Sequence, residues 1–166
     1  VVAAVHELMG GEKAEHFGNI HRTFEDGERL VTTPPYTAYL KIAEGCSNGC
    51  AFCIIPKLRG RYRSRSMEAL LAEARQLADS GVKELIVIAQ DITRYGMDLE
   101  EPTSLAGLLK ELCKLDFHWI RLHYLYPEVI TDELIDTIAR EKKIVHYLDI
   151  PIQHCNDGIL KAMRRR

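Results

Sequence analysis

Short apolar runs alternate with segments of helical periodicity from Tyr39 onward. The four apolar runs cover residues 39–45, 82–90, 119–127 and 144–153. Between and after them, apolar residues recur three or four positions apart over 67–78, 105–115, 134–139 and 159–163. Each of these segments follows a Ser, Thr or Asn, residue types that cap helix N-termini. Four strand–helix units in succession predict an α/β fold with a parallel sheet, whose functional residues lie at the carboxyl ends of the strands.

Polar residues within the predicted strands fall on one face. The odd positions of the first, third and fourth strands carry Lys41, Arg121, His123, Asp149 and Gln153. The even positions are apolar and include, in the fourth strand, Leu148, Ile150 and Ile152. Because charged side chains inside a fold need a partner or a ligand, this pattern favours a partial (β/α) TIM-like barrel with a polar lumen over an open sheet covered on both faces. In the second strand Gln90 and Asp91 lie on opposite phases, so the pattern leaves open which of them points inward.

The first 38 residues differ from the rest. Residues 1–10 predict the last turns of a helix that ends at Gly10 and Gly11, and residues 11–38 predict a polar linker. The chain starts at Val1 and stops at three arginines, 164–166, within a predicted helix whose exposed side we expect them to occupy. We therefore expect a piece of a longer protein, with a barrel core over 39–166 that is incomplete at its carboxyl end.

Composition excludes some classes of function. The net charge of −2 over 166 residues excludes a globally basic nucleic-acid binder. Five positive charges nevertheless fall within 57–65, which predicts either a local anion-binding surface or a solvated loop neutralised by nearby acids. No apolar run is long enough to span a bilayer and no signal peptide is visible, so we expect no membrane association. The odd number of cysteines, three of them close together, indicates a reducing compartment, and we expect the cytoplasm.

The three clustered cysteines carry the clearest chemistry. Cys46, Cys50 and Cys53 form a C-x3-C-x2-C pattern in a connection of about twenty residues, much longer than an ordinary βα loop. Gly45 and Gly49 allow the backbone to curl, so that three thiolates can converge on a 4Fe–4S cluster. Three protein ligands leave one iron open to an exogenous ligand. Two alternatives stay open: a structural zinc site, for which no fourth Cys or His occurs between Phe24 and Leu112, and three unligated buried cysteines.

The wider motif resembles a known family. The C-x3-C-x-F-C pattern after a first strand resembles the signature of radical S-adenosylmethionine (radical SAM) enzymes. The segments YLKIAEGCSNGCAFCIIPKLRGRYRSR, VIAQDITRYG, RLHYLYP and YLDIPIQH are similar to the methylthiotransferases of that superfamily. Within them the similarity is greatest to the RimO branch, which modifies an aspartate of a small-subunit ribosomal protein. The transfer-RNA-modifying MiaB branch would carry something like GQN at Ala89-Gln90-Asp91 and QSGS over 153–156.

The resemblance implies a mechanism. The open iron would be chelated by the amino and carboxylate groups of SAM. Sulfur on a second cluster would be methylated by one SAM, and the cluster on Cys46, Cys50 and Cys53 would reduce another to give a 5'-deoxyadenosyl radical. That radical would take a hydrogen from the β-carbon of the substrate aspartate, where methylthio is attached. The family carries its second cluster on an amino-terminal domain of which residues 1–10 resemble only the last helix, so this stretch alone is not expected to complete the reaction.

Five further residues are candidates for SAM binding, each with an ordinary structural alternative. Phe52 would lie near the adenine or merely cover the cluster. Gln90 and Asp91 would bind the SAM amino group or cap the turn that follows their strand. Arg121 would hold a carboxylate or form an ion pair with Asp149, which Lys41 could share. Gln153 would reach the ribose.

Three other residues receive weaker assignments. His123 is a possible acid or base, although an interior His satisfied by its neighbours is commoner. Cys113 is expected to be a small apolar residue in a helix, and Cys155 is expected to be incidental although it faces the site.

The resemblance also implies partners. They are a small-subunit ribosomal protein as substrate, an electron donor such as flavodoxin or ferredoxin, and ribosomal RNA contacting residues 57–65. Two other functions stay open at this point. One is a MiaB-like transfer-RNA methylthiotransferase, and the other is a non-catalytic, metal-stabilised RNA-binding module.

Overall fold

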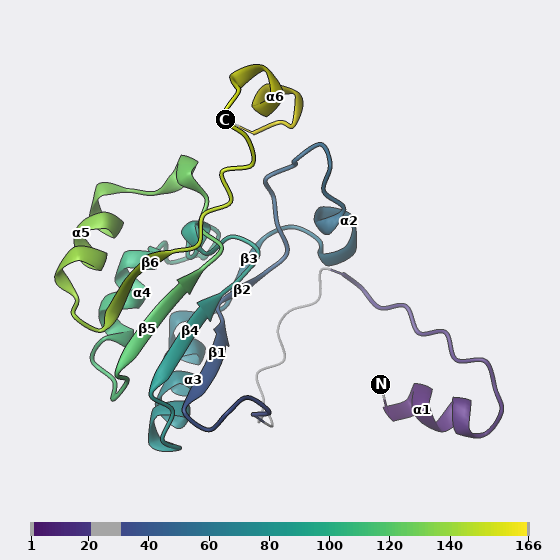
Figure 1. Ribbon diagram of the computed structural model, residues 1–166. Coiled ribbons are helices and arrows are strands. Elements are labelled where there is room, and N and C mark those ends of the chain that lie inside the picture. Colours follow the sequence, from purple (N-terminus) through teal and green to yellow (C-terminus); the bar gives the residue numbers. More distant parts are fainter. Residues whose placement is uncertain (1, 21–30, 166) are drawn as a thin grey trace.

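Four parallel strands form the central sheet of the protein (Figure 1). The computed structural model describes residues 2–20 and 31–165. The strands are β1 (Thr37–Lys41), β4 (Glu84–Ile88), β5 (Trp119–His123) and β6 (Ile144–Leu148), in that spatial order. Register places Lys41 beside Ile88 and Ile88 beside His123, so the carboxyl ends of the first three strands are level. The predicted parallel α/β arrangement is confirmed.

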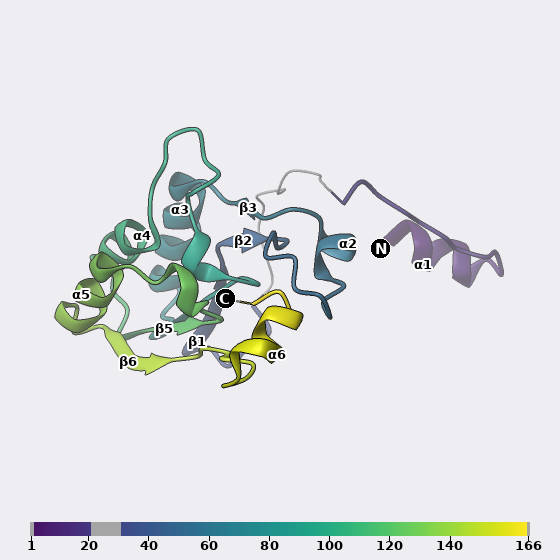
Figure 2. The same ribbon diagram turned by 90° about the horizontal axis from the view of Figure 1, so that it is seen from above.

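Three helices cover one face of this sheet. They are α3 (Met67–Asp79), α4 (Leu105–Leu112) and α5 (Asp132–Arg140), and Figure 2 shows them together on one side of the strands. Each begins where the sequence predicted, because the side chain of Ser66, Ser104 or Thr131 accepts a hydrogen bond from the backbone amide three residues on. Among the described residues, no comparable helical layer covers the opposite face in Figure 2. This is the asymmetry of a barrel wall.

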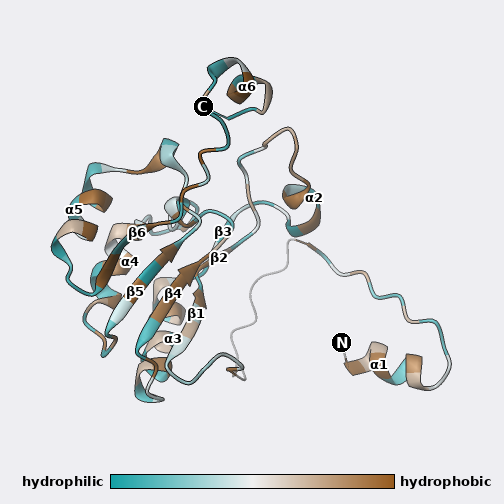
Figure 3. Ribbon diagram, viewed as in Figure 1, coloured by the Kyte–Doolittle hydropathy of each residue, from teal (hydrophilic) through white to brown (hydrophobic). Residues whose placement is uncertain are grey.

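The alternation in β1 and β5 is the predicted one. Leu40, Ile120 and Leu122 are completely buried under the helices, whereas Lys41, Arg121 and His123 are only half-buried on the other face. β4, between them, has a run of three buried residues, Leu85–Val87, and is apolar after its first residue, Glu84 (Figure 3). β4 thus buries Ile86 on the face where its neighbours β1 and β5 carry Tyr39 and Arg121.

β6 departs from the prediction. The strand ends at Leu148 rather than continuing to residue 153, and a register irregularity lies between its pairs with Ile120 and Leu122. Leu148 and Ile152 are exposed rather than buried. The expected apolar face of the fourth strand is therefore wrong at Leu148 and Ile152, whereas Ile150 is partly buried against the core. β6 is the edge of the sheet, so no further strand fixes its alternation, and a bulge shifts the phase of the residues that follow it.

The loop elements gather at the carboxyl ends of the strands. They include the short antiparallel pair β2 (Ala43–Glu44) and β3 (Arg63–Ser64), the helix α2 (Ile55–Arg59), the 3-10 turns η1 (Ile92–Arg94) and η2 (Pro127–Val129), and α6 (Asp157–Ala162). Figure 1 shows α2 and α6 beyond the tips of the strand arrows. The long connection after β1 is thus part of the rim of the sheet, where parallel α/β folds place their ligands.

The amino-terminal helix α1 (Val2–Met9) contributes nothing to the core, since none of its residues is buried. It ends before Gly10 and Gly11, as expected. Of the predicted linker, residues 21–30 lie outside the described part of the chain. Among the helices of residues 2–20 and 31–165, none has the length and apolar character needed to cross a membrane.

Candidate metal and cofactor site

The loop that carries the three cysteines is anchored at its start by Gly45. Gly45 has φ of 77°, and a Cβ at this position would lie 2.2 Å from the carbonyl oxygen of Arg61. The next residue, Cys46, donates its backbone N–H to the carbonyl of Gly60 at 3.2 Å. Only glycine permits both the left-handed conformation and the close approach of the two chain segments. The β2–β3 pair and this contact fix the direction in which the loop leaves the sheet.

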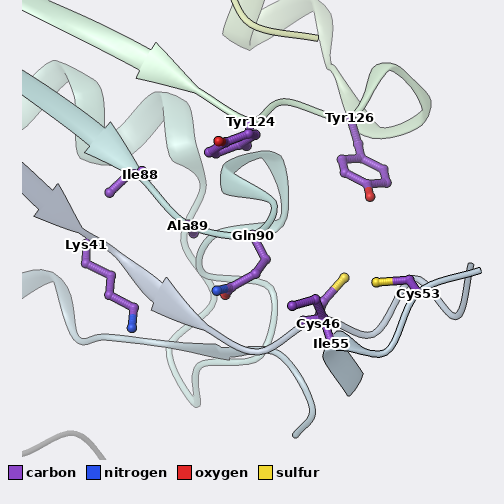
Figure 4. Close-up of a pocket in the computed structure, with 9 residues that line it drawn as sticks. All are labelled: Lys41, Cys46, Cys53, Ile55, Ile88, Ala89, Gln90, Tyr124 and Tyr126. Carbon is purple, nitrogen blue, oxygen red and sulfur yellow. The ribbon is translucent and has the colours of Figure 1, made fainter. Parts of the chain in front are cut away.

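Two of the cysteines face a common cavity. Cys46 and Cys53 line a cavity of about 340 Å³ together with Lys41, Ile55, Ile88, Ala89, Gln90, Tyr124 and Tyr126. Figure 4 shows the sulfurs of Cys46 and Cys53 turned toward each other, with Tyr126 on the far side of the opening. The five cysteines of the chain are all free thiols. The cavity therefore joins the sulfur donors to the ends of β1, β4 and β5.

Cys50 takes a different direction. It is buried but lines a second cavity, together with Asn48, Arg94, Glu128 and other residues. Within residues 2–20 and 31–165, no group of three or more Cys, His, Asp or Glu side chains is arranged as a metal site. The spacing predicts that three thiolates converge, but only Cys46 and Cys53 line the same cavity. Cys50 would have to turn toward that cavity to join them.

Burial sets the protonation of Cys46. Loss of water around the thiol raises the pKa of Cys46, and the Asp91 carboxylate and the other two clustered thiols raise it further. A hydrogen bond from the backbone of Asn48 opposes the shift. The metal-free thiol is therefore held neutral, and binding of a metal must displace its proton.

Gln90, not Asp91, faces the cavity. The side-chain oxygen Oε1 of Gln90 is buried and has no hydrogen-bond partner among the described residues. Asp91 is fully buried, and both of its carboxylate oxygens accept hydrogen bonds, Oδ1 from the backbone amide of Thr93 and Oδ2 from Nδ2 of Asn48. The sequence left open which of Gln90 and Asp91 points inward, and the structure shows that Gln90 faces the cavity. Asp91 caps η1, the structural alternative considered for it.

The other three SAM candidates lie away from this cavity lining. Arg121 donates to Oε1 of Glu84 through Nε at 2.8 Å and Nη2 at 2.6 Å. Gln153 is exposed, with φ of 64°, and the Phe52 side chain is 59% exposed on the cysteine loop. Their predicted contacts with SAM stay predictions.

The ion pairs expected in the lumen have different partners. Arg121 pairs with Glu84, at the start of the neighbouring strand, rather than with Asp149. Lys41 pairs with Glu44 instead of sharing that pair. Glu84 lies on the neighbouring strand and Glu44 three residues after Lys41, whereas Asp149 follows the end of β6. The expectation of an Arg121–Asp149 pair is therefore wrong.

Arg165 also contradicts its expected position. It was expected on an exposed helix side, but only 6% of it is exposed. Its guanidinium carbon lies 3.9 Å above the ring of Tyr126, its Nε lies 3.7 Å from Glu128, and its Nη1 contacts the Cys50 sulfur at 3.9 Å. Arg164 has φ of 54°, so the chain leaves the helical phase and turns Arg165 inward. Arg164 itself is exposed, and Arg166 lies outside the described residues.

The basic segment 57–65 is partly neutralised. Arg65 pairs with Glu73 at 2.6 Å, and Arg59 lies 3.8 Å from Glu44. Arg63 donates to the carbonyls of Arg59 and Arg61, which holds the loop together from within. Lys57 and Arg61 are exposed. Much of the positive charge thus has a structural partner, which weakens but does not remove the expectation of an anion-binding surface.

The two remaining cysteines, Cys113 and Cys155, differ in burial. Cys113 is buried at the C-terminal end of α4, where burial raises the pKa of its thiol to about 12. Cys155 is exposed. His123 is half-buried, with its ring edge-on to Tyr124.

Sequence reasoning missed four residues of this region: Asn48, Tyr124, Tyr126 and Arg165. Asn48 lies between the first two cysteines, so its place in the motif was a usable signal. Tyr126 follows β5 by three residues and lines both cavities. No local pattern indicates Arg165, whose contacts come from residues 14 to 115 positions away.

The donor set fits a 4Fe–4S cluster with one open iron. Three thiols lie on one loop, Gly45 and Gly49 let it turn, and Arg165 places positive charge beside Cys50, where an assembly that carries negative charge would be held. The unpartnered oxygen of Gln90 is an acceptor suited to an ammonium donor in the cavity.

Two curated relatives that this chain matches share one description. The chain is 53% identical over 167 residues to the ribosomal protein uS12 methylthiotransferase RimO of Caldanaerobacter subterraneus subsp. tengcongensis, covering 99% of this chain and 38% of that protein. It is 60% identical over 139 residues to the protein of the same name from Pelobacter propionicus, covering 83% of this chain and 31% of that protein. The chain thus spans less than two fifths of the length of these relatives.

The fold and the family agree. The structure matches radical S-adenosylmethionine methyltransferase TsrM from Kitasatospora setae, solved with cobalamin and a 4Fe–4S cluster, with a TM-score of 0.62 over 78% of this chain and 24% of that one at 17% identity. This likeness confirms the expected partial barrel. Residues 40–166 match the family model of the radical SAM superfamily, which supports the predicted cofactors, a 4Fe–4S cluster and SAM. The chain belongs to the radical SAM superfamily.

Proposed function

We propose that the chain carries the radical-generating centre of a methylthiotransferase that modifies an aspartate of ribosomal protein uS12. The observation that carries the proposal is the cavity lined by Cys46, Cys53 and the unpartnered oxygen of Gln90, in a chain 53% identical to a RimO protein. Because the chain spans 38% of that relative's length, the complete reaction is proposed for the whole protein.

The residues of the cysteine loop and of the cavity have different roles in this proposal. Cys46, Cys50 and Cys53 hold the cluster, and Gln90 accepts a hydrogen bond from the amino group of SAM. Tyr124 and Tyr126 form a wall of the cavity and exclude water from it. When bound, the cluster and SAM supply a carbon radical that removes hydrogen from an unactivated carbon. The protein's own contribution is to position the substrate carbon and to keep the cavity closed to water and oxygen.

Movement of Cys50 is part of this proposal. Arg165 Nη1 lies 3.9 Å from the Cys50 sulfur, and the backbone amide of Ala51 donates to the carbonyl of Met163 at 3.0 Å. These contacts connect the cysteine loop to α6. Cluster binding would draw Cys50 toward the cavity of Cys46 and Cys53 while Arg165 remains beside it as a countercharge.

The substrate assignment rests on the similarity to RimO proteins named for uS12. A transfer-RNA substrate is the second candidate, favoured only by exposed Lys57 and Arg61 in the basic segment. The partial neutralisation of that segment favours the protein substrate, with ribosomal RNA as an auxiliary contact of residues 57–65.

The proposal includes the organisation of the whole protein. Residues 1–10 would end an amino-terminal domain that carries a second cluster, 11–38 would link it to the barrel, and 39–166 would form most of the radical SAM core. A flavodoxin or ferredoxin would supply the electron, in the reducing cytoplasm that the free thiols suit.

The experiment separates the cofactor chemistry from the substrate. The full protein is reconstituted with iron and sulfide without oxygen, then given SAM and a reductant. Formation of 5'-deoxyadenosine supports the radical SAM function, and its absence from a protein with a full cluster contradicts it. Methylthio incorporation is then compared between ribosomal protein uS12 and transfer RNA. Incorporation into transfer RNA alone would replace the proposed substrate with the second candidate.

A further inference from the structure

Asn48 ties the cysteine loop to the end of β4. Its Nδ2 donates to Oδ2 of Asp91 at 3.0 Å, and its Oδ1 accepts from Nε of Arg94 at 2.8 Å. The same Arg94 nitrogen lies 3.2 Å from Oδ2 of Asp91. The three side chains therefore close a triangle in which the amide of Asn48 uses both its donor and its acceptor.

Asp91 is itself held rigidly. It is fully buried, its Oδ1 accepts from the backbone amide of Thr93 at 3.1 Å, and the Thr93 hydroxyl also donates to it. That hydroxyl oxygen accepts from the backbone amide of Tyr126 at 3.4 Å. The carboxylate thus connects the cysteine loop, the end of β4 and the segment after β5. Asp91 and Thr93 are buried, whereas Asn48 and Arg94 are partly exposed, so the network is most costly to break at the buried carboxylate.

We propose that Asp91, acting through Asn48, is a positioning residue that sets the place of the cysteine loop on the sheet. The proposal rests on the proposed function, because the loop's task is to hold the cluster. Asn48 lies two residues after Cys46 and two before Cys50, midway between two ligands. Fixing its side chain therefore limits the conformations open to both thiols before any metal binds, which reduces the ordering cost of cluster assembly.

A reciprocal exchange tests this pairing. Asn48→Asp alone sets two carboxylates about 3 Å apart, one of them fully buried, which breaks the triangle. Adding Asp91→Asn restores one amide and one carboxylate with their places exchanged, and Arg94 still meets a carboxylate. In the full reconstituted protein we expect Asn48→Asp to lose iron to a chelator at least tenfold faster than the wild type. The double variant should return to within about threefold.

Asn48→Ala provides a second variant that introduces no charge. We expect it to lose iron several-fold faster, and to shift the EPR signal of the reduced cluster when SAM is added. In the iron-free protein, alkylation of Cys46 and Cys50 should be several-fold faster than in the wild type, with Cys113 as the internal reference by mass spectrometry. The apo melting temperature of this variant should change by only a few degrees. Asp116→Asn, in an exposed pair with Lys83, is the matched control and should change none of these quantities.

The outcomes are separable from those of the proposed function. A wild-type protein that binds no iron contradicts the proposed function, while the alkylation rates still report on the loop. The positioning role is wrong if Asn48→Ala holds iron and protects its thiols as the wild type does. It is also wrong if the double variant folds but retains iron no better than Asn48→Asp. Should Asn48→Asp fail to fold, Asn48→Ala decides alone.

Discussion

The helix-covered face of the sheet and the rim at its carboxyl ends are held together by different interactions. On the covered face, Leu40, Leu85 and Leu122 are fully buried among apolar neighbours. At the rim, Asn48, Asp91 and Thr93 are joined by hydrogen bonds, and two cavities open beside the cysteines. Apolar packing stabilises the fold without specifying a ligand, whereas directed polar contacts place individual groups. Stability and function should therefore respond to different substitutions.

The largest effect is expected on the covered face. Leu122→Ala should lower the free energy of unfolding by about 3 to 4 kcal/mol, because it leaves a cavity in a fully buried layer. Urea denaturation of the iron-free protein measures this. Leu148→Ala, at a position 39% exposed on the edge strand, is the matched control and should cost under about 1 kcal/mol. Equal costs at the two positions would show that the covered face is not the stabilising one.

At the rim, the largest loss of stability is expected from substitution of Gly45, which packs closely against the chain at Arg61. Gly45→Ala combines a left-handed backbone with a clash against Arg61, and should cost about 3 kcal/mol. Gly49→Ala keeps the first penalty alone, since a Cβ there meets nothing within 4 Å, and should cost about 1 kcal/mol. Chemical denaturation of both variants gives the comparison. A Gly45→Ala protein as stable as Gly49→Ala would mean that the two segments do not approach as closely as described.

Cys113, at the C-terminal end of α4, is expected to make a pH-dependent contribution to the free energy of unfolding. Burial raises the pKa of its thiol from 9.0 to about 12 in the folded protein. Since the folded pKa lies above the unfolded one, this stability is complete below pH 9 and is lost as pH rises from about 9 toward 12. The wild type should therefore lose more stability over that range than Cys113→Ala, measured by urea denaturation at each pH. Parallel curves for the two proteins would rule the contribution out.

The smallest effect on stability is expected at Cys50. Cys50→Ala should change the unfolding free energy of the iron-free protein by no more than about 1 kcal/mol, because it removes one small side chain. It should nevertheless abolish assembly of the cluster on this loop, measured as a loss of about four bound iron and four sulfide ions per chain after anaerobic reconstitution of the full protein. Cys155→Ala, at an exposed cysteine, should leave both quantities unchanged. Normal cluster content in Cys50→Ala would remove Cys50 from the ligand set.

The same contrast explains how much the sequence alone could predict. The predicted helix over 67–78 is found over 67–79, because Ser66 caps it and its apolar period is local information. The polar phase of β1 and β5 is also local, and was predicted. The bulge and early end of β6 depend on a missing neighbour at the sheet edge, which the strand's own pattern does not contain.

The site was predictable only in its ligand types. Cys46, Cys50 and Cys53 are predicted as ligands from their spacing, and Gln90 and Asp91 as candidates from their position after a strand. Gln90 and Asp91 point in different directions. Asn48, 43 residues away, and Thr93 form hydrogen bonds with Asp91, which leaves Gln90 facing the cavity. Arg165 was misplaced because a left-handed turn at Arg164 overrides the helical period. Contacts between distant segments carry this information, and a single sequence does not show them.

The central claim is that Cys46, Cys50 and Cys53 hold a 4Fe–4S cluster with one iron open to SAM. The most direct test compares the full protein with a variant in which all three cysteines are alanine, both reconstituted without oxygen. The account predicts a loss of about four iron and four sulfide ions per chain in the variant, and an EPR signal in the wild type that changes when SAM is added to the reduced protein. Unchanged iron content in the variant, zinc bound in place of iron, or a three-cysteine cluster whose spectrum ignores SAM would contradict it.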